Sequence, residues 1–234
     1  MKKFIGLFLL IFLLPILAFA DAEPPAPAPA TFEEGKDYLA IPSNPSTDSV
    51  KTKDKITVIE FFNYGCPACS KLDPALEKWA ANKPHHVVFK RIPVVFDPGW
   101  DVYAKTYLVV HQMNLDEKVT PAIFKAIHDD GIDLSNKDAM ADFLNGKELK
   151  KEDFLNLYNS PEIDIDMAKN KKITSDFLVF QIPGIVIDGK YKVDPSLSGG
   201  DSARLIETVD YLIKLESKTT KPAAPQKVSP KPPQ

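Results

Sequence analysis

A strand, a helix and a second strand follow one another between residues 56 and 95, and this unit constrains the fold more than any other feature. Ile56 to Phe62 is an almost unbroken apolar run rich in β-branched residues, as expected for a strand buried on both faces. Val87 to Val95 has the character of a second strand. The stretch from Cys69 to Asn82 between them has apolar residues at helical spacing: Leu72, Leu76, Trp79 and Ala80. The unit therefore predicts two parallel strands joined by a right-handed crossover.

Further elements complete a mixed sheet. Tyr38 to Ile41 is predicted to be a short strand, and Ile185 to Val193 a hairpin with Asp188-Gly189 as its turn. A last amphipathic helix is predicted from Ser202 to Leu215. The expected fold class is α/β, in which a βαβ unit and a later ββα unit share one sheet.

The segment between Val95 and the hairpin is about 85 residues long, far more than a crossover connection needs. Its pattern predicts helices throughout. They are expected at Val102 to Gln112, Pro121 to Asp129, Lys137 to Leu144 behind a Ser135 cap, Lys151 to Tyr158 and Pro161 to Ile173. A helical insertion thus interrupts the sheet, and a groove is expected where the two parts meet.

The first 20 residues have the three parts of a secretory signal peptide. Lys2 and Lys3 are positive, Phe4 to Leu17 is apolar, and Ala18-Phe19-Ala20 supplies the small residues that a signal peptidase reads. A transmembrane anchor is the alternative, but the apolar run is shorter than the ~20 residues that a span needs. We therefore expect cleavage before Asp21 and export to an oxidising compartment.

The remaining chain is divided by composition and by the predicted elements. A linker rich in Pro and Ala and a tail rich in Pro and Lys are expected to be disordered. The expected boundaries are 21–35 for the linker, 36–96 for the first part of the α/β domain, 97–177 for the helical insertion, 178–216 for the second part of the α/β domain and 217–234 for the tail.

Charge and cysteine content exclude several classes of protein. The 29 basic and 32 acidic residues give a net charge of −3, which offers no electrostatic footprint for nucleic acid. Two cysteines cannot form the disulfide framework of a small secreted domain. Zinc needs four ligands, and His85 and His86 are adjacent rather than spaced, so neither a metal nor another cofactor is expected.

The chemistry is expected at Cys66-Pro67-Ala68-Cys69, where the buried strand ends and the helix begins. The N–H groups and positive dipole end of that helix stabilise a thiolate at Cys66. Cys69, one turn further on, can close a small disulfide with Cys66, and Pro67 fits the first turn because its missing N–H is not needed there. We expect Cys66 to be the accessible nucleophile and Cys69 the shielded resolving thiol. An inert structural disulfide is the alternative, but so short a loop removes little entropy from the unfolded chain.

Glu60 is the unusual residue of its strand. It shares the parity of Ile56, Val58 and Phe62, so its carboxylate is expected inside an apolar layer, six residues before Cys66. Burial raises the pKa of a carboxyl group, which makes Glu60 a candidate proton acceptor for the thiol of Cys69. The alternative is a carboxylate that is neutralised by a lysine and has no further role.

The pattern Glu-Phe-Phe-x-x-x-Cys-Pro-x-Cys, followed far downstream by Ile182-Pro183-Gly184 and Asp188-Gly189-Lys190-Tyr191, resembles the DsbA family of periplasmic thiol:disulfide oxidoreductases. The resemblance implies a thioredoxin fold interrupted by a helical domain, and a cis Ile182–Pro183 bond lying against the cysteine pair. Pro183 then belongs to the catalytic set with Cys66, Cys69 and Glu60. Pro67, Ala68 and Ile182 form the surface that would bind a substrate peptide.

The resemblance implies an exported, periplasmic dithiol oxidase that acts on unfolded secreted proteins with free cysteines and is reoxidised by a DsbB-like, quinone-linked membrane oxidase. Members of the family commonly have histidine where this chain has Ala68, so we expect a less oxidising disulfide than in the strongest oxidants. A periplasmic reductase or isomerase, and a non-catalytic peptide-binding module with a structural disulfide, remain alternatives.

Overall fold

The fold is built around a mixed β-sheet. The computed structural model describes residues 31–42 and 50–219. The sheet has five strands in the order β1-β5-β4-β2-β3, and only β2 and β3 pair in parallel. The strands are β1 (Leu39–Ala40), β2 (Ile56–Phe62), β3 (Val87–Pro93), β4 (Gly184–Ile187) and β5 (Tyr191–Val193). The α/β class and the mixed sheet predicted from the sequence are confirmed.

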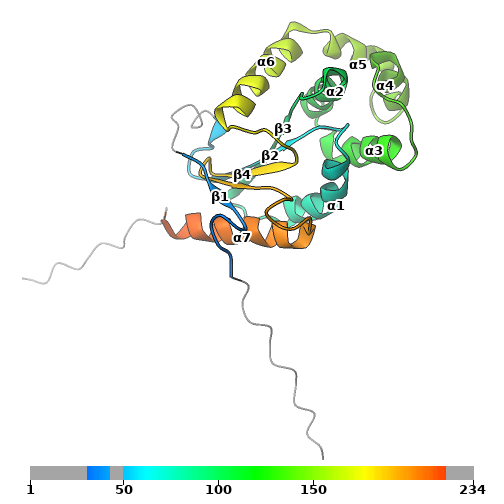
Figure 1. Ribbon diagram of the computed structural model, residues 1–234. Coiled ribbons are helices and arrows are strands. Elements are labelled where there is room, and N and C mark those ends of the chain that lie inside the picture. Colours follow the sequence, from blue (N-terminus) through cyan, green and yellow to red (C-terminus); the bar gives the residue numbers. More distant parts are fainter. Residues whose placement is uncertain (1–30, 43–49, 220–234) are drawn as a thin grey trace, which may run out of the picture. The chain divides into compact units, whose positions relative to one another are not determined.

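The predicted βαβ unit is present, with helix α1 (Pro67–Asn82) joining β2 to β3 (Figure 1). Every residue of β2 is buried, as its apolar run predicts. β3 ends at Pro93, two residues before the expected end at Val95, because its partner strand ends at Phe62. The N–H of Val94 still donates to the carbonyl of Phe62, at 2.8 Å, and this bond holds the two strand ends together.

Helices cover both faces of the sheet. On one face, Ile56 and Val58 of β2 pack with residues of α1 and of α7 (Ser202–Thr219). On the other face, Ile59 and Phe61 pack against residues at the end of α6 (Pro161–Asp176). Figure 1 shows the strands between α6 and α7. The alternation of the β2 side chains therefore decides which helix each residue contacts.

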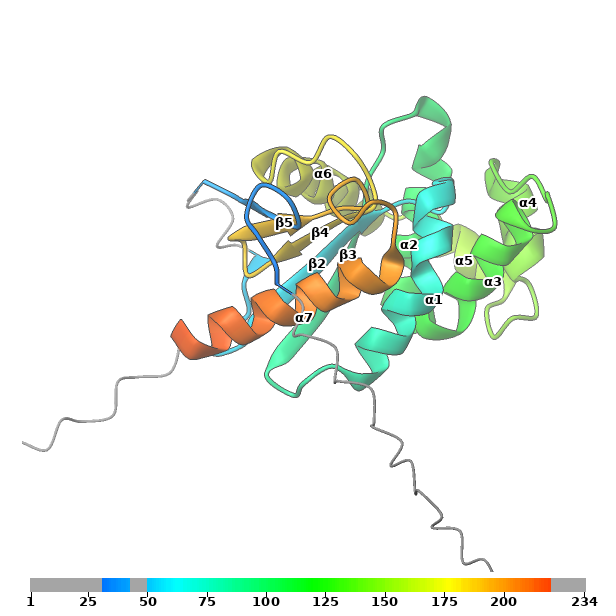
Figure 2. The same ribbon diagram turned by 60° about the horizontal axis from the view of Figure 1, so that its bottom comes forward.

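The expected helical insertion is also present. After a short 3-10 turn at Pro98–Trp100, it contains α2 (Asp101–Gln112), α3 (Asp116–His128), α4 (Lys137–Leu144) and α5 (Lys151–Tyr158). These helices share one apolar cluster, which also takes in Phe62, Tyr64 and both cysteines. Figure 2 shows α3, α4 and α5 gathered beyond α1. The core of the insertion is therefore continuous with the end of β2.

Several predicted helix boundaries and one predicted helix cap are wrong. Helix α3 begins at Asp116 rather than at Pro121, which lies inside the helix; Asp116 and Glu117 suit a helix start because they face the positive end of its dipole. The cap of α4 is Asn136 rather than Ser135, since the Asn136 side chain accepts the N–H of Ala139 at 2.8 Å. Helices α6 and α7 continue to Asp176 and Thr219, beyond their expected ends at Ile173 and Leu215.

The remaining predictions concern the hairpin turn and the two ends of the chain. The hairpin turn is at Asp188-Gly189 as predicted, with φ angles of +51° and +70°. Phe32, which lies within the expected linker boundaries, stacks on Tyr211 of α7 at 4.9 Å between ring centroids. The expected signal peptide, most of the linker and residues 220–234 of the tail lie outside the described residues. No helix in the described ranges is long and apolar enough to cross a membrane.

Helix α6 ends in a left-handed turn that has leucine where glycine is usual. Leu178 has a φ of +50° and donates its N–H to Ser175, while Val179 donates to Thr174. These two bonds form the common glycine-terminated end of a helix, in which a β-carbon is strained.

We predict that Leu178→Gly raises the free energy of unfolding by ~1 kcal/mol, because it removes this strain at a side chain that is largely exposed. Urea denaturation monitored by circular dichroism measures the change. Leu178→Ala is the matched control, since it shortens the side chain but keeps the β-carbon. A gain in Leu178→Ala as large as that in Leu178→Gly would contradict this explanation.

Candidate active site

The two cysteines are joined at the start of α1. Cys66 is the N-terminal cap of the helix, and its sulfur accepts the backbone N–H of Cys69 at 3.1 Å. A disulfide links the pair, with 5.2 Å between the Cα atoms. Cys66 is 4% exposed and Cys69 is 0% exposed, so the first sulfur is the one nearer to solvent. A negative charge on Cys66 would therefore meet an N–H group that already points at its sulfur.

The segment before β4 lies against this pair. The Ile182–Pro183 bond is cis, and the carbonyl oxygen of Ile182 is 3.7 Å from the sulfur of Cys66. Residues 116 positions apart are thus brought together, as the family pattern implies. A peptide attached to Cys66 would lie next to the backbone of this segment.

Asn63 holds the loop between β2 and α1 in place, and the sequence analysis did not identify it. Its side chain is fully buried and donates to the carbonyl groups of Val94 and Trp100, at 2.8 and 3.2 Å. Its side-chain oxygen accepts the N–H of Gly65 at 2.9 Å, and its carbonyl accepts the N–H of Cys66 at 3.1 Å. One amide therefore connects the end of β3 and the start of the helical insertion to the residues around Cys66.

Gly65 is in close contact with the indole ring of Trp100. A β-carbon at position 65 would lie 2.8 Å from the indole nitrogen and 3.1 Å from two ring carbons. Trp100 ends the 3-10 turn that opens the helical insertion. Any side chain at position 65 would force this ring away from the residue that precedes Cys66.

Helix α3 of the insertion also contacts the loop that precedes Cys66. The ring nitrogen Nε2 of His128, at the end of α3, lies 2.7 Å from the carbonyl oxygen of Tyr64 and must donate to it. The hydroxyl of Tyr64 is 2.9 Å from the hydroxyl of Thr120. Helix α3 thus fixes both the backbone and the side chain of a residue two positions before Cys66.

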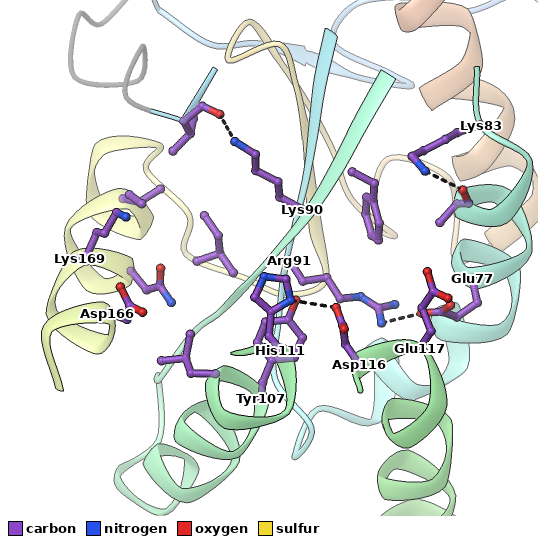
Figure 3. Close-up of a pocket in the computed structure, with 17 residues that line it drawn as sticks. Glu77, Lys83, Lys90, Arg91, Tyr107, His111, Asp116, Glu117, Asp166 and Lys169 are labelled. Carbon is purple, nitrogen blue, oxygen red and sulfur yellow. Dashed lines mark hydrogen bonds and ion pairs between the residues drawn. The ribbon is translucent and has the colours of Figure 1, made fainter. Parts of the chain in front are cut away.

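Glu60 is buried, but its partner is an arginine rather than the lysine considered as the alternative. It pairs in register with Arg91 of β3, and the two side chains are 2.6 Å apart. The same guanidinium contacts Asp73 and Glu77 of α1, each at 2.7 Å. Figure 3 shows Arg91 reaching toward Glu77 at the wall of a polar pocket of about 430 Å³. We call Arg91, Glu60, Asp73 and Glu77 the buried charge cluster.

One cation does not balance three carboxylates in this cluster. Burial raises the pKa of Glu60 even though the Arg91 guanidinium acts in the opposite direction, and burial likewise raises the pKa of Asp73 and of Glu77. Glu60 is 1% exposed, whereas the Glu77 side chain is 27% exposed. The cluster is therefore suited to hold a proton, and Glu77 is its carboxylate that lines the pocket.

Sequence reasoning found Glu60 but missed the residues that surround it. A buried carboxylate implies a buried cation in the neighbouring strand, and Arg91 stands in the middle of the second predicted strand. Asp73 and Glu77 lie one and two helical turns after Cys69 on the predicted helix. In the described part of the chain, no group of three His, Cys, Asp or Glu side chains is arranged to hold a metal ion.

Comparison with known proteins identifies close relatives. A family model described as DSBA-like thioredoxin domain matches residues 57–209. Over 211 residues the chain is 36% identical to the thiol:disulfide interchange protein DsbA of Pseudomonas aeruginosa, covering 90% of this chain and 98% of that protein. The DsbA of Azotobacter vinelandii is 35% identical over 189 residues, which is 81% of this chain and 86% of that protein.

Solved structures agree with these sequence matches. The crystal structure of Pseudomonas aeruginosa DsbA superposes with a TM-score of 0.75 at 36% identity, covering 81% of this chain and 97% of that one. The oxidoreductase DsbA from Xylella fastidiosa gives a TM-score of 0.70 at 28% identity, covering 80% of this chain and 98% of that one.

The contact between Gly65 and Trp100 predicts an energetic coupling. Gly65→Ala should cost about 1–3 kcal/mol of unfolding free energy, because its β-carbon overpacks the indole. The same substitution in a Trp100→Ala background should cost much less, since the ring is absent. A double-mutant cycle from urea denaturation measures the coupling, and strictly additive costs would contradict it.

The raised pKa of Glu60 predicts a pH-dependent stability. The folded protein holds the Glu60 proton more tightly than the unfolded chain, whose pKa is near 4.3. The free energy of unfolding of the unmodified protein, relative to that of Glu60→Gln, should therefore increase as the pH falls from neutrality through the raised pKa toward about 4.3. It should decrease as the pH rises.

Urea denaturation at a series of pH values tests this sign. Glu152→Gln, at an exposed position in α5, is the matched control and should have nearly the same pH profile as the unmodified protein. A difference in the free energy of unfolding between Glu60→Gln and the unmodified protein that does not change with pH would contradict the assignment. So would an unmodified protein that becomes more stable than Glu60→Gln as the pH rises.

Proposed function

Because the chain belongs to the DsbA family of thiol:disulfide oxidoreductases, we propose that it is an exported dithiol oxidase in which Cys66 is the nucleophile and Cys69 the resolving thiol. One observation carries the assignment of the two roles. The sulfur of Cys66 caps α1 and accepts the N–H of Cys69, while Cys69 itself is fully buried. A thiolate is stabilised at the first position and not at the second.

The exchange then proceeds in two attacks. A substrate thiolate attacks the sulfur of Cys66, the Cys66–Cys69 bond breaks, and Cys69 leaves with the bonding electron pair. A second thiolate of the substrate attacks the substrate sulfur of this mixed disulfide, and Cys66 leaves as a thiolate. The substrate loses two electrons and forms its disulfide, and the protein gains them as a reduced pair.

Glu60 is proposed to handle the proton of Cys69. A thiolate left at a fully buried sulfur lacks solvent, so it needs a proton when the disulfide opens and must lose it when the disulfide forms again. The buried charge cluster contains carboxyl groups with raised pKa values, and Glu60 is its innermost member. Asp73 and Glu77 continue the cluster toward the pocket of Figure 3, where a proton can reach water.

The substrate-binding surface is proposed to consist of Pro67, Ala68 and Ile182. Pro183 is proposed to hold Ile182 in place. Support comes from the 3.7 Å between the carbonyl oxygen of Ile182 and the sulfur of Cys66. An extended peptide held at Cys66 would pass this carbonyl and can pair with the backbone beside it. Unfolded secreted proteins with free cysteines are the substrates that such a site would accept.

The compartment and the partner are proposed by analogy with the family. Relatives of this chain are DsbA proteins, and the predicted signal peptide supports export to the periplasm. A reduced protein must be reoxidised before the next turnover, for which we propose a DsbB-like, quinone-linked membrane oxidase. The electron balance of the cycle requires an acceptor of two electrons.

Equilibration with glutathione buffers tests the direction of flow. We predict a reduction potential well above about −270 mV, the value of thioredoxin, and a Cys66 pKa well below the ordinary value near 8.5. Ala68→His should lower the Cys66 pKa and make the disulfide more oxidising, because it adds a stabilising partner for the thiolate. A potential near that of thioredoxin would identify a reductase instead.

Trapping tests the two cysteine roles. Cys69→Ser should accumulate mixed disulfides with cysteine-containing substrates, which non-reducing gels detect, whereas Cys66→Ser should not. A Cys66→Ser protein with full biological activity would instead favour a peptide-binding module whose disulfide is structural.

A further inference from the structure

Strand β3 forms an open edge of the sheet beside the polar pocket shown in Figure 3. It is the last strand of the sheet, and β2 is its only strand partner within residues 31–42 and 50–219. Four consecutive residues, Phe89 to Ile92, line the pocket. Val88 to Arg91 are partly exposed, whereas β2 is buried throughout. The backbone of β3 is therefore accessible from this pocket.

The outward hydrogen-bonding groups of this edge belong to Phe89 and Arg91. In a parallel pair, successive residues of a strand direct their N–H and carbonyl groups to opposite sides. The carbonyl of His86 and the N–H of Val94 bond to β2, so the even-numbered residues of β3 face that strand. Phe89 and Arg91 therefore face outward, and neither backbone has a partner there in the described part of the chain. Pro93 takes the next outward position, where a missing N–H leaves the sheet intact.

On the side of α6, the edge carries two lysines. Lys90 is partly buried and donates to the carbonyl of Val50 at 2.9 Å. Burial lowers the pKa of Lys90, and the nearby charge of Lys169 lowers it further. Among the described residues neither lysine has an ion-pair partner, although Asp166 lines the pocket on the same helix as Lys169. This side of the edge is therefore suited to receive a carboxylate.

On the side of α1, the edge carries carboxylates. Glu77 and Glu117 both line the pocket, across β3 from Lys169 (Figure 3). Burial raises the pKa of Glu77, and the like charge of Glu117 adds to this effect. A basic side chain would be favourable here. The other charged or ionisable lining residues of this side already have partners: Arg91, Asp116, His111 and Lys83.

We propose that the outer edge of β3 is a docking site for an extended peptide segment of another protein, which adds a strand to the sheet and has an acidic residue next to a basic one. The segment pairs with the free backbone groups of Phe89 and Arg91. Successive side chains of a strand face opposite sides, so the acidic residue meets the two lysines and its basic neighbour meets the two glutamates.

The pocket admits one segment because α1 and α6 flank the edge, which protects it from pairing with a whole second sheet. Neither cysteine lines this pocket, so the docking site goes beyond the proposed disulfide exchange.

Amide hydrogen exchange of the full chain, followed by NMR, tests the site with a cysteine-free peptide, acetyl-Val-Thr-Glu-Lys-Val-Thr-amide. Without peptide, the amides of Phe89 and Arg91 should exchange faster than those of Val88 and Lys90, which face β2. Saturating peptide should slow exchange at Phe89 and Arg91 by about tenfold or more, because it supplies their missing partners. Val88 and Lys90 are the internal controls and should not change.

Modified peptides test the strand geometry. Methylation of the backbone nitrogen is made at the glutamate in one peptide and at the lysine in another. Since alternate residues pair with β3, one of the two should bind about tenfold more weakly and the other nearly as well as the parent.

A charge variant tests the lysine side of the edge. Lys169→Gln should weaken binding of the parent peptide by about two- to fivefold, the scale of an exposed ion pair. It should not affect a peptide with threonine in place of the glutamate. Lys171→Gln is the matched control, because Lys171 is an exposed residue of the same helix that does not line this pocket.

Four results would overturn the proposal. The amides of Phe89 and Arg91 are already protected in the free chain, or the parent peptide shows no saturable binding at ~1 mM. Alternatively, both methylated peptides bind as well as the parent, or light scattering shows that two copies of the chain pair through β3. Cys66→Ser should bind the peptide unchanged, which separates this site from failure or success of the disulfide exchange.

Discussion

The buried side chain of Asn63 is the interaction on which the arrangement of the redox site depends. Strand β2 is buried on both faces and ends at Phe62, and α1 begins at Pro67, so only a short loop sets the position of Cys66. The loop buries the side chain of Tyr64 in the apolar cluster of the insertion. Its shape comes from hydrogen bonds that Asn63 makes to Val94, Trp100 and Gly65, which belong to three different segments. Loss of this amide would leave buried partners unpaired, which is more costly than the loss of the bonds alone.

The helical insertion supports the same loop from a second side. His128 and Thr120 of α3 contact the backbone and the hydroxyl of Tyr64, and the indole of Trp100 fills the space that a side chain at Gly65 would need. The apolar cluster of the insertion includes both cysteines. The insertion is therefore part of the candidate active site, and its packing decides how rigidly Cys66 is held.

The sequence predicted the elements whose signals are local. The βαβ unit, the Asp188-Gly189 turn and the placement of Cys66 at a helix start follow from periodicity and turn chemistry in short windows. Asn63 and Arg91 were missed because their importance depends on contacts with residues about 30 positions away. The boundary of α3 was misplaced because proline marks a helix start only as a tendency, and here acidic residues upstream of Pro121 begin the helix.

The pairing of Glu60 with Arg91 has a consequence for how the sheet is assembled. The two residues are direct partners across the parallel pair of β2 and β3, and each carries a charge inside an apolar layer. A shift of β2 by one residue would move Glu60 to the face of Ile59 and Phe61, where the packed residues are apolar. Strands as uniformly apolar as β2 specify their alignment poorly by hydrophobicity alone, because either face can be buried. The pairing of Glu60 with Arg91 favours one alignment of the two strands, because any other alignment would separate these two buried charges.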